Sequence, residues 1–155
     1  MKLRDQLLIL AAAVVLTGLA RAASNVVYDE KADAPKQVTA TIAEASRSGQ
    51  YIVLVFGANW CPDCHALDAQ MHKPELAALV EKNFLVVKVD VGRIDKNLEL
   101  ARKYGVPLRR GIPAMAVLDP QGKLLYAQDQ GQFADARHMR FESIKAFFDR
   151  WKPKG

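Results

Sequence analysis

The chain has 155 residues, 50% hydrophobic and 25% charged, which favours one globular domain with a sizeable core over a disordered chain. Its formal net charge of +5 is small, and the basic residues are scattered along the sequence without an aromatic-interleaved basic stripe. The composition therefore predicts no nucleic-acid partner.

The N-terminus predicts export from the cytoplasm. A charged start is followed by an apolar stretch over residues 7–20 and by small residues at Ala20-Arg21-Ala22, where a leader peptidase would cut. The apolar stretch is shorter than the roughly 20 residues that a membrane-spanning helix needs, so cleavage is favoured over an uncleaved anchor. We therefore expect a signal peptide over residues 1–22 and a domain over residues 23–155. We expect the mature domain, without membrane insertion, in the periplasm or another exported compartment.

Hydrophobic periodicity predicts the elements in the first half of the domain. The apolar run 26–28 predicts a short edge strand. Residues 35–48 begin with proline and repeat apolar residues at spacings of four and three, which predicts an amphipathic helix. The uninterrupted run 51–56 is rich in β-branched and aromatic residues and predicts a strand buried on both faces. Helix-forming residues after the second cysteine predict another helix, which Pro74 should kink or restart.

The second half of the domain begins with the same alternation and ends with an antiparallel hairpin. Residues 84–90 predict a second buried strand, and Asp95 predicts the cap of a helix that runs to Tyr104. This alternation predicts parallel strands joined by crossover helices. Residues 113–128 predict two antiparallel strands around a tight turn. From Met139 onward, aromatic residues share one helical face and predict a final helix packed on the sheet.

The two cysteines of the chain lie in Trp60-Cys61-Pro62-Asp63-Cys64-His65, directly after the first long predicted strand. A disulfide between them would close a very small loop and remove little entropy from the unfolded chain, so a structural staple is the weaker interpretation. If Cys61 lies at the mouth of a helix with Pro62 in its first turn, free N–H groups and the helix dipole favour its thiolate. Cys61 is therefore the predicted nucleophile of disulfide exchange, and Cys64 is the predicted resolving thiol.

Two charged neighbours should tune this pair. Asp63 places a negative charge near Cys61, and at about 8 Å the repulsion of a thiolate is roughly 0.5 to 2 kcal/mol before screening. His65 would offset that charge only when protonated. This balance favours a reductant or an isomerase-type pair over a strong oxidant.

Three other interpretations of the motif compete with redox exchange. Residues 61–65 match the Cys-x-x-Cys-His signature of c-type haem attachment, although the flanking β runs do not suit a mostly helical haem domain. Cys61, Cys64, His65 and His72 could supply metal ligands, but adjacent helical residues point in different directions. A non-catalytic binding module is the third, and it predicts that Cys61→Ser leaves function intact. We expect neither a metal nor an organic cofactor.

Three sequence features together resemble the thioredoxin-like superfamily. They are Trp60-Cys61-Pro62-Asp63-Cys64 after a buried strand, Lys88 within the next strand, and Gly111-Ile112-Pro113 before the hairpin. The sequence is most similar to exported thioredoxin-like proteins described as disulfide isomerases. The resemblance covers nearly the whole mature chain and implies the thioredoxin fold, a single α/β domain with a mixed central sheet flanked by helices. It also implies thiol-disulfide exchange on protein substrates and a redox partner that recycles the cysteines.

The resemblance also implies roles for residues outside the cysteine pair. Pro113 would be a cis-proline that faces the cysteines, and the backbone of Ile112 would pair with an extended substrate. The residues expected to tune the active site are Trp60, Pro62, Asp63, His65 and Lys88.

The chain departs from thioredoxin in two places. The buried acid that thioredoxin carries before its active site falls at Val55, which leaves Lys88 without its usual partner. The proton acceptor for Cys64 then stays open among Asp63, Lys88 and water. The link 107–110 is also longer than in the family, and its arginines could meet an acidic substrate, although a solvated loop is favoured.

Overall fold

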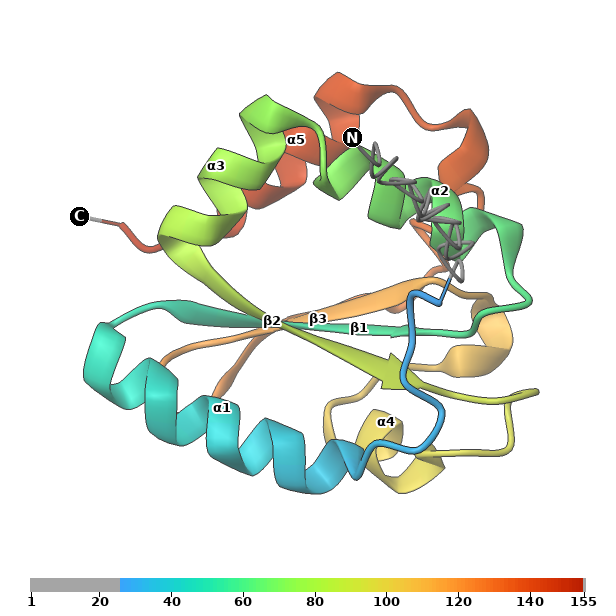
Figure 1. Ribbon diagram of the computed structural model, residues 1–155, viewed down its shortest axis with the longest axis horizontal. Coiled ribbons are helices and arrows are strands. Elements are labelled where there is room, and N and C mark those ends of the chain that lie inside the picture. Colours follow the sequence, from blue (N-terminus) through green and yellow to red (C-terminus); the bar gives the residue numbers. More distant parts are fainter. Residues whose placement is uncertain (1–25, 155) are drawn as a thin grey trace, which may run out of the picture.

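The computed structural model describes residues 26–154, and in them a four-stranded sheet lies between two layers of helices (Figure 1). The predicted signal peptide lies outside the described residues. The strands are β1 (Tyr51–Gly57), β2 (Phe84–Asp90), β3 (Ala114–Leu118) and β4 (Leu124–Ala127). The α-helices are α1 (Ala34–Ser48), α2 (Pro62–Met71), α3 (Pro74–Asn83), α4 (Leu98–Lys103) and α5 (Phe141–Trp151). Two 3-10 turns, η1 (Leu108–Arg110) and η2 (Ala136–His138), complete the chain. Within residues 26–154, no helix has the length and apolar character needed to cross a membrane.

The sheet is mixed and has the order β2-β1-β3-β4. The central strand β1 runs parallel to β2 and antiparallel to β3, and β3 forms the predicted hairpin with β4. Gly57, the last residue of β1, pairs with Asp90, the last residue of β2. The two parallel strands therefore end at the same edge of the sheet, where α2 begins with the cysteine motif.

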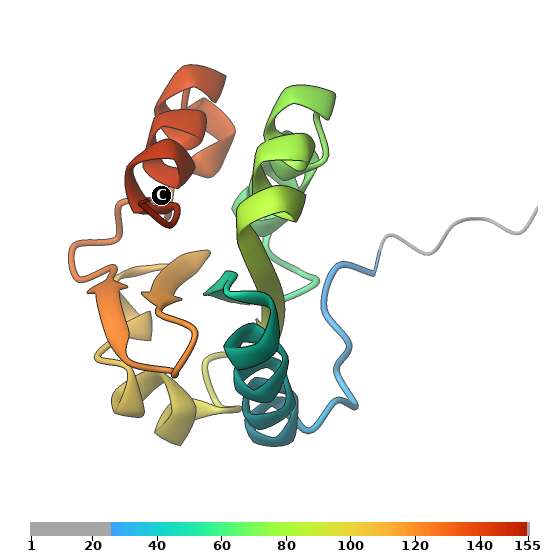
Figure 2. The same ribbon diagram turned by 90° about the vertical axis from the view of Figure 1, so that its left-hand side faces the viewer.

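Alternation along β1 divides the core into two layers. Ile52, Leu54 and Phe56 pack with α1 and α4 on one face, whereas Val53 and Val55 pack with α2, α3 and α5 on the other. Figure 2 shows these layers from the side, with α1 on one face of the sheet and α3 and α5 on the opposite face. The prediction that 51–56 is buried on both faces is therefore confirmed, and each fully buried large side chain contributes about 1.5 to 3 kcal/mol.

The ends of two helices match their sequence signals. The Asp33 side chain accepts a hydrogen bond from Lys36 N at 3.0 Å and caps α1, which ends where Gly49 adopts a φ of 76°. Pro74 restarts the chain as a separate helix, so α2 and α3 are distinct elements.

Two predicted local features are wrong. Residues 26–28 do not form a strand, because the N–H groups of Val27 and Tyr28 both donate to the Asn59 side chain at 2.9 Å and not to a neighbouring strand. Asp95 does not cap a helix, because its carboxylate accepts a hydrogen bond from Arg93 N within a turn and α4 begins only after Asn97. In both places a side chain binds backbone N–H groups that the sequence pattern assigned to a regular element, from a distant segment in the case of Asn59 and from within the same turn in the case of Asp95.

Candidate active site

The cysteine motif occupies the junction of β1 and α2. Cys61 is the N-cap residue of α2, Pro62 is in its first turn, and Cys64 follows one turn later. Cys61 and Cys64 form a disulfide, with their Cα atoms 5.3 Å apart. The predicted placement of the pair at the start of a helix is therefore confirmed.

The N-terminus of α2 directs hydrogen-bond donors at Cys61. The Cys64 N–H donates to Cys61 Sγ at 3.2 Å, and the His65 N–H donates to the Cys61 carbonyl oxygen at 3.3 Å. The Cys64 N–H and the positive end of the helix dipole would stabilise a Cys61 thiolate after reduction, whereas the His65 bond is part of the helix backbone. Cys61 is 3% exposed and Cys64 is 1% exposed, but only Cys61 lines the surface groove described next. This asymmetry supports Cys61 as the nucleophile and Cys64 as the resolving thiol.

A groove of about 680 Å³ lies beside Cys61. Trp60 is 50% exposed on its wall, and its indole N–H donates to the Gly92 carbonyl oxygen at 2.7 Å. Arg93 stacks over the Trp60 ring at 5.8 Å, and Arg109 lines the groove from η1. The groove thus combines an aromatic wall with two cationic side chains next to the sulfur.

The loop before β3 closes the other side of the site. The Ile112–Pro113 peptide bond is cis, which is the geometry that the resemblance implies. The Ile112 carbonyl oxygen lies 3.5 Å from Cys61 Sγ. Gln128 is 1% exposed and braces this loop, since its amide donates to the Pro113 carbonyl oxygen at 3.2 Å and accepts from Met115 N at 3.3 Å. No sequence pattern marks Gln128, because only its tertiary contacts distinguish it from other polar residues near a strand end.

Asp63, between the cysteines, binds the segment around η2. Its carboxylate accepts hydrogen bonds from Arg137 N at 3.0 Å and from Arg137 Nε at 3.1 Å. Burial by itself raises the pKa of Asp63, but these hydrogen bonds and the Arg137 charge outweigh it, so the pKa lies below its ordinary value. The positive charge of Arg137 compensates the negative charge of Asp63. The Asp63 carboxylate therefore repels a Cys61 thiolate less than the sequence predicts.

We expect Asp63→Asn to lower the free energy of unfolding by about 1 kcal/mol near neutral pH, because a charge-assisted bond becomes a neutral one. A carboxylate with a lowered pKa stabilises the fold above its ordinary pKa of 3.8, and this stabilisation is lost as pH falls through the lower folded value. The stability difference between wild type and Asp63→Asn should therefore shrink below about pH 4. Urea unfolding between pH 2.5 and 7 measures it.

Asp135→Asn is the matched control for this prediction. Asp135 also lies beside η2 and pairs with His138, but its side chain is 71% exposed. Such a surface pair contributes about 0 to 1 kcal/mol, so this variant should follow the wild-type acid profile closely. If the free energy of unfolding of Asp63→Asn and of Asp135→Asn changed with pH in the same way, the contact between Asp63 and Arg137 would not stabilise the fold.

Comparison with known proteins identifies the family. A family model described as thioredoxin-like matches residues 33–120. The chain belongs to the thioredoxin-like family. A solved structure of a disulphide isomerase from Xylella fastidiosa Temecula1 is 46% identical, with a TM-score of 0.79, and the match covers 83% of this chain and 98% of that one. The reduced C-terminal domain of DsbD from Neisseria meningitidis shares the fold at 19% identity and a TM-score of 0.54, over 78% of this chain and 98% of that one.

Two curated proteins match only part of the chain. Probable nucleoredoxin 3 from Oryza sativa subsp. japonica is 29% identical over 50% of this chain, and the match spans 20% of the relative's length. Thiol:disulfide interchange protein DsbD 2 from Pseudomonas aeruginosa is 28% identical over 57% of this chain and is matched over 15% of its own length. The predicted thioredoxin fold is confirmed, and the protein is a thioredoxin-like oxidoreductase with a Cys-x-x-Cys pair.

The thioredoxin-like site contains a charged pair, Lys88 with Asp68, that the sequence did not predict. Val55 is 1% exposed in the apolar core, as the departure from thioredoxin implied. Lys88 is nevertheless paired, because its ammonium group contacts the Asp68 carboxylate on α2. Lys88 therefore lacks its usual partner at position 55, as expected, and pairs with a different carboxylate that was not predicted. Asp68 was missed, although its position four residues after Cys64 places both residues on the same side of the helix.

The histidines do not form the alternative sites that the sequence left open. His65 Nε2 is 2.6 Å from the Asn59 carbonyl oxygen, so this ring nitrogen is engaged and is not directed at a haem iron. His72 is 74% exposed and contacts Asp68, away from the cysteines. Among the residues that the structure describes, no three His, Cys, Asp or Glu side chains lie together in a way that could hold a metal ion. The thioredoxin-like fold and these contacts favour redox exchange over haem or metal binding.

Proposed function

We propose that this thioredoxin-like protein is an exported thiol-disulfide oxidoreductase that acts on polypeptide disulfides in the reductase or isomerase direction. The observation that carries the proposal is the position of the Cys61–Cys64 pair, with helix donors on Cys61 and the cis Ile112–Pro113 bond beside it. The groove next to Cys61 offers room for an extended peptide, and the backbone of Ile112 at its edge is the predicted partner for that peptide. Arg93 and Arg109 favour substrates with acidic residues near the disulfide.

The proposed reaction begins with the reduced protein. The Cys61 thiolate attacks one sulfur of a substrate disulfide, forms a mixed disulfide and releases the other substrate sulfur as a thiolate. Cys64 loses its proton to water and attacks Cys61 Sγ, which releases the second substrate sulfur and leaves Cys61 and Cys64 oxidised. Two electrons have then passed to the substrate. A thiol-containing redox partner returns them, and relatives named for thiol:disulfide interchange support such a partner.

The isomerase direction would use the same first step without net electron transfer. The mixed disulfide would be attacked by another substrate thiol, which restores reduced Cys61 and leaves a rearranged substrate. The 46% identity to a disulphide isomerase supports this direction. The Asp63 charge contributes less to the choice than the sequence suggests, because Arg137 compensates it.

The reduction potential of the Cys61/Cys64 pair tests the proposed direction. Equilibration with glutathione or dithiothreitol buffers, read out by alkylation and mass spectrometry, gives that potential directly. A value near about −270 mV supports a reductase, a value near about −180 mV supports an isomerase, and a value near about −120 mV would contradict both. Turnover of insulin and reactivation of scrambled ribonuclease then separate reduction from isomerisation.

Export is tested separately. The charged, apolar and small-residue pattern over residues 1–22 supports a cleaved signal. Expression of the full chain in a bacterium followed by periplasmic extraction should give a protein whose N-terminal residue is Ala23. Recovery of an unprocessed chain from the cytoplasm would contradict export.

A further inference from the structure

Tyr28 has a hydroxyl group without a partner in the core of the protein. Its side chain is 0% exposed, and among residues 26–154 no atom forms a hydrogen bond with its Oη. Leaving a buried hydroxyl unpaired costs about 1 to 3 kcal/mol. Such a group is expected to have a partner in another state of the protein.

The sulfur of Cys64 lies close to the Tyr28 hydroxyl, beside Gly57. A Cβ built on Gly57 would overlap the Tyr28 hydroxyl and lie 2.9 Å from Cys64 Sγ. The hydroxyl and the sulfur therefore converge on the same small space, which exists because residue 57 has no side chain. Tyr28 and Cys64 belong to the same apolar cluster, and both side chains are buried.

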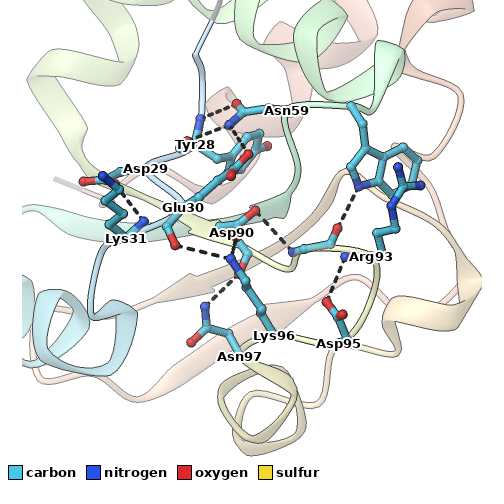
Figure 3. A network of polar contacts seen from close by, with 12 residues as sticks. Tyr28, Asp29, Glu30, Lys31, Asn59, Asp90, Arg93, Asp95, Lys96 and Asn97 are labelled. Atoms are coloured by element: carbon cyan, nitrogen blue, oxygen red, sulfur yellow. Dashed lines mark hydrogen bonds and ion pairs between the residues drawn. The ribbon is translucent and has the colours of Figure 1, made fainter.

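The active-site motif itself holds Tyr28 in place. The Asn59 side chain accepts hydrogen bonds from the N–H groups of Val27 and Tyr28 at 2.9 Å, and it donates to the Tyr28 carbonyl oxygen at 2.9 Å. Figure 3 shows the contacts of Asn59 with Tyr28 and with Glu30, which is a further acceptor of the Asn59 amide. Asn59 immediately precedes Trp60 and Cys61, so these contacts fix the position of the tyrosine relative to the cysteine motif.

We propose that Tyr28 is a positioning residue whose Oη–H donates a hydrogen bond to Cys64 Sγ when the Cys61–Cys64 disulfide is open. The inference rests on the proposed redox function of this pair. A disulfide sulfur is a weak acceptor, whereas a thiolate is a strong one, so the hydroxyl gains its partner only in the reduced protein. The hydrogen bond would lower the pKa of the Cys64 thiol and favour its attack on the mixed disulfide.

The surroundings keep the hydroxyl protonated, as a donor must be. Burial, followed by the negative charges of Asp68 and Asp90, raises the pKa of Tyr28 well above its ordinary value of 10.0. Lys88 also faces the ring, with Nζ 5.7 Å from its centroid, and is paired with Asp68. Tyr28 therefore donates a hydrogen bond without transferring its proton, and the Cys64 proton still leaves to water.

The test is Tyr28→Phe, which removes the hydroxyl and keeps the ring. The reduced protein should lose a hydrogen bond and the oxidised protein should lose only an unpaired group. We expect the equilibrium constant for reduction of the pair by dithiothreitol to fall roughly tenfold, which equals about 30 mV toward a more negative potential. In a Cys61→Ser background, the pKa of Cys64, measured from thiolate absorbance against pH, should rise by about one unit.

The control is Tyr104→Phe, which removes a hydroxyl from another buried tyrosine in the same apolar cluster. This variant should leave the potential and the Cys64 pKa at wild-type values. Thermal unfolding of each oxidised variant checks folding, and Tyr28→Phe should be at least as stable as wild type when oxidised. An unchanged potential and an unchanged Cys64 pKa in Tyr28→Phe would overturn the inference. Failure of the wild-type pair to titrate reversibly would instead reject the proposed function.

Discussion

Cys61→Ser is expected to reduce insulin turnover with dithiothreitol to the uncatalysed rate. A serine hydroxyl in place of the Cys61 thiol cannot form a mixed disulfide, and Cys64 cannot replace Cys61, because Cys64 is buried and does not line the groove. The Cys64 N–H, which favours a thiolate, is also directed at Cys61 Sγ. The measurement is the rate of insulin B-chain precipitation at fixed dithiothreitol.

Cys64→Ser is the matched variant for this experiment, because it also replaces a cysteine sulfur with a serine oxygen, three residues further along the chain. Without the resolving thiol, Cys61 should still attack the substrate and then remain joined to it. Non-reducing electrophoresis and mass spectrometry should therefore detect a mixed disulfide with Cys64→Ser and none with Cys61→Ser. Equal turnover by wild type and Cys61→Ser would reject enzymatic exchange and favour a non-catalytic binding module.

Gly57→Ala is expected to have the largest effect on stability among substitutions near the site. The added Cβ would overlap the Tyr28 hydroxyl and approach Cys64 Sγ to 2.9 Å, in a region without exposed surface into which either could move. Overpacking of this kind costs about 1 to 3 kcal/mol, and the rigid surroundings place Gly57 at the upper end of that range. Urea unfolding of the oxidised protein measures the loss.

Gly49→Ala is the control that separates this steric clash from the backbone strain that replacing a glycine can cause. Gly49 has a φ of 76° and nothing within 4 Å of a built Cβ, so its replacement costs only the left-handed backbone strain of about 1 kcal/mol. Gly57→Ala should be clearly less stable than Gly49→Ala, and Tyr28→Leu should restore part of the loss when combined with Gly57→Ala. A smaller loss for Gly57→Ala than for Gly49→Ala would contradict the packing described around Tyr28.

The sequence predicts those parts of the fold that depend on local patterns. The position of β1 follows from an uninterrupted apolar run, that of β2 from an apolar run interrupted only by Lys88, and the start of α2 from Pro62 after Cys61. Both patterns reflect backbone preferences within a few residues, which is why they can be recognised without tertiary information. The pairing of Cys61 with Cys64 can also be predicted locally, because residues three positions apart at the start of a helix have neighbouring side chains.

The rest of the site depends on contacts between distant segments. Asp63 and Arg137 are 74 positions apart, and Tyr28 and Asn59 are 31 positions apart. Nothing in the local pattern around either partner marks these contacts, because each polar residue has many exposed alternatives. Residues 26–28 show the result most clearly, since their apolar pattern suits a strand but the Asn59 side chain takes their hydrogen bonds.

The contact between Asp63 and Arg137 has a consequence for protein engineering. The dipeptide Pro62-Asp63 separates the two cysteines, so its exchange is a direct way to alter the redox pair. In this protein Asp63 also accepts two hydrogen bonds from Arg137, so a dipeptide without that carboxylate would remove these bonds to the C-terminal segment while it altered the chemistry. A transplant that preserves the architecture would need residues 62, 63 and 137 to be exchanged together.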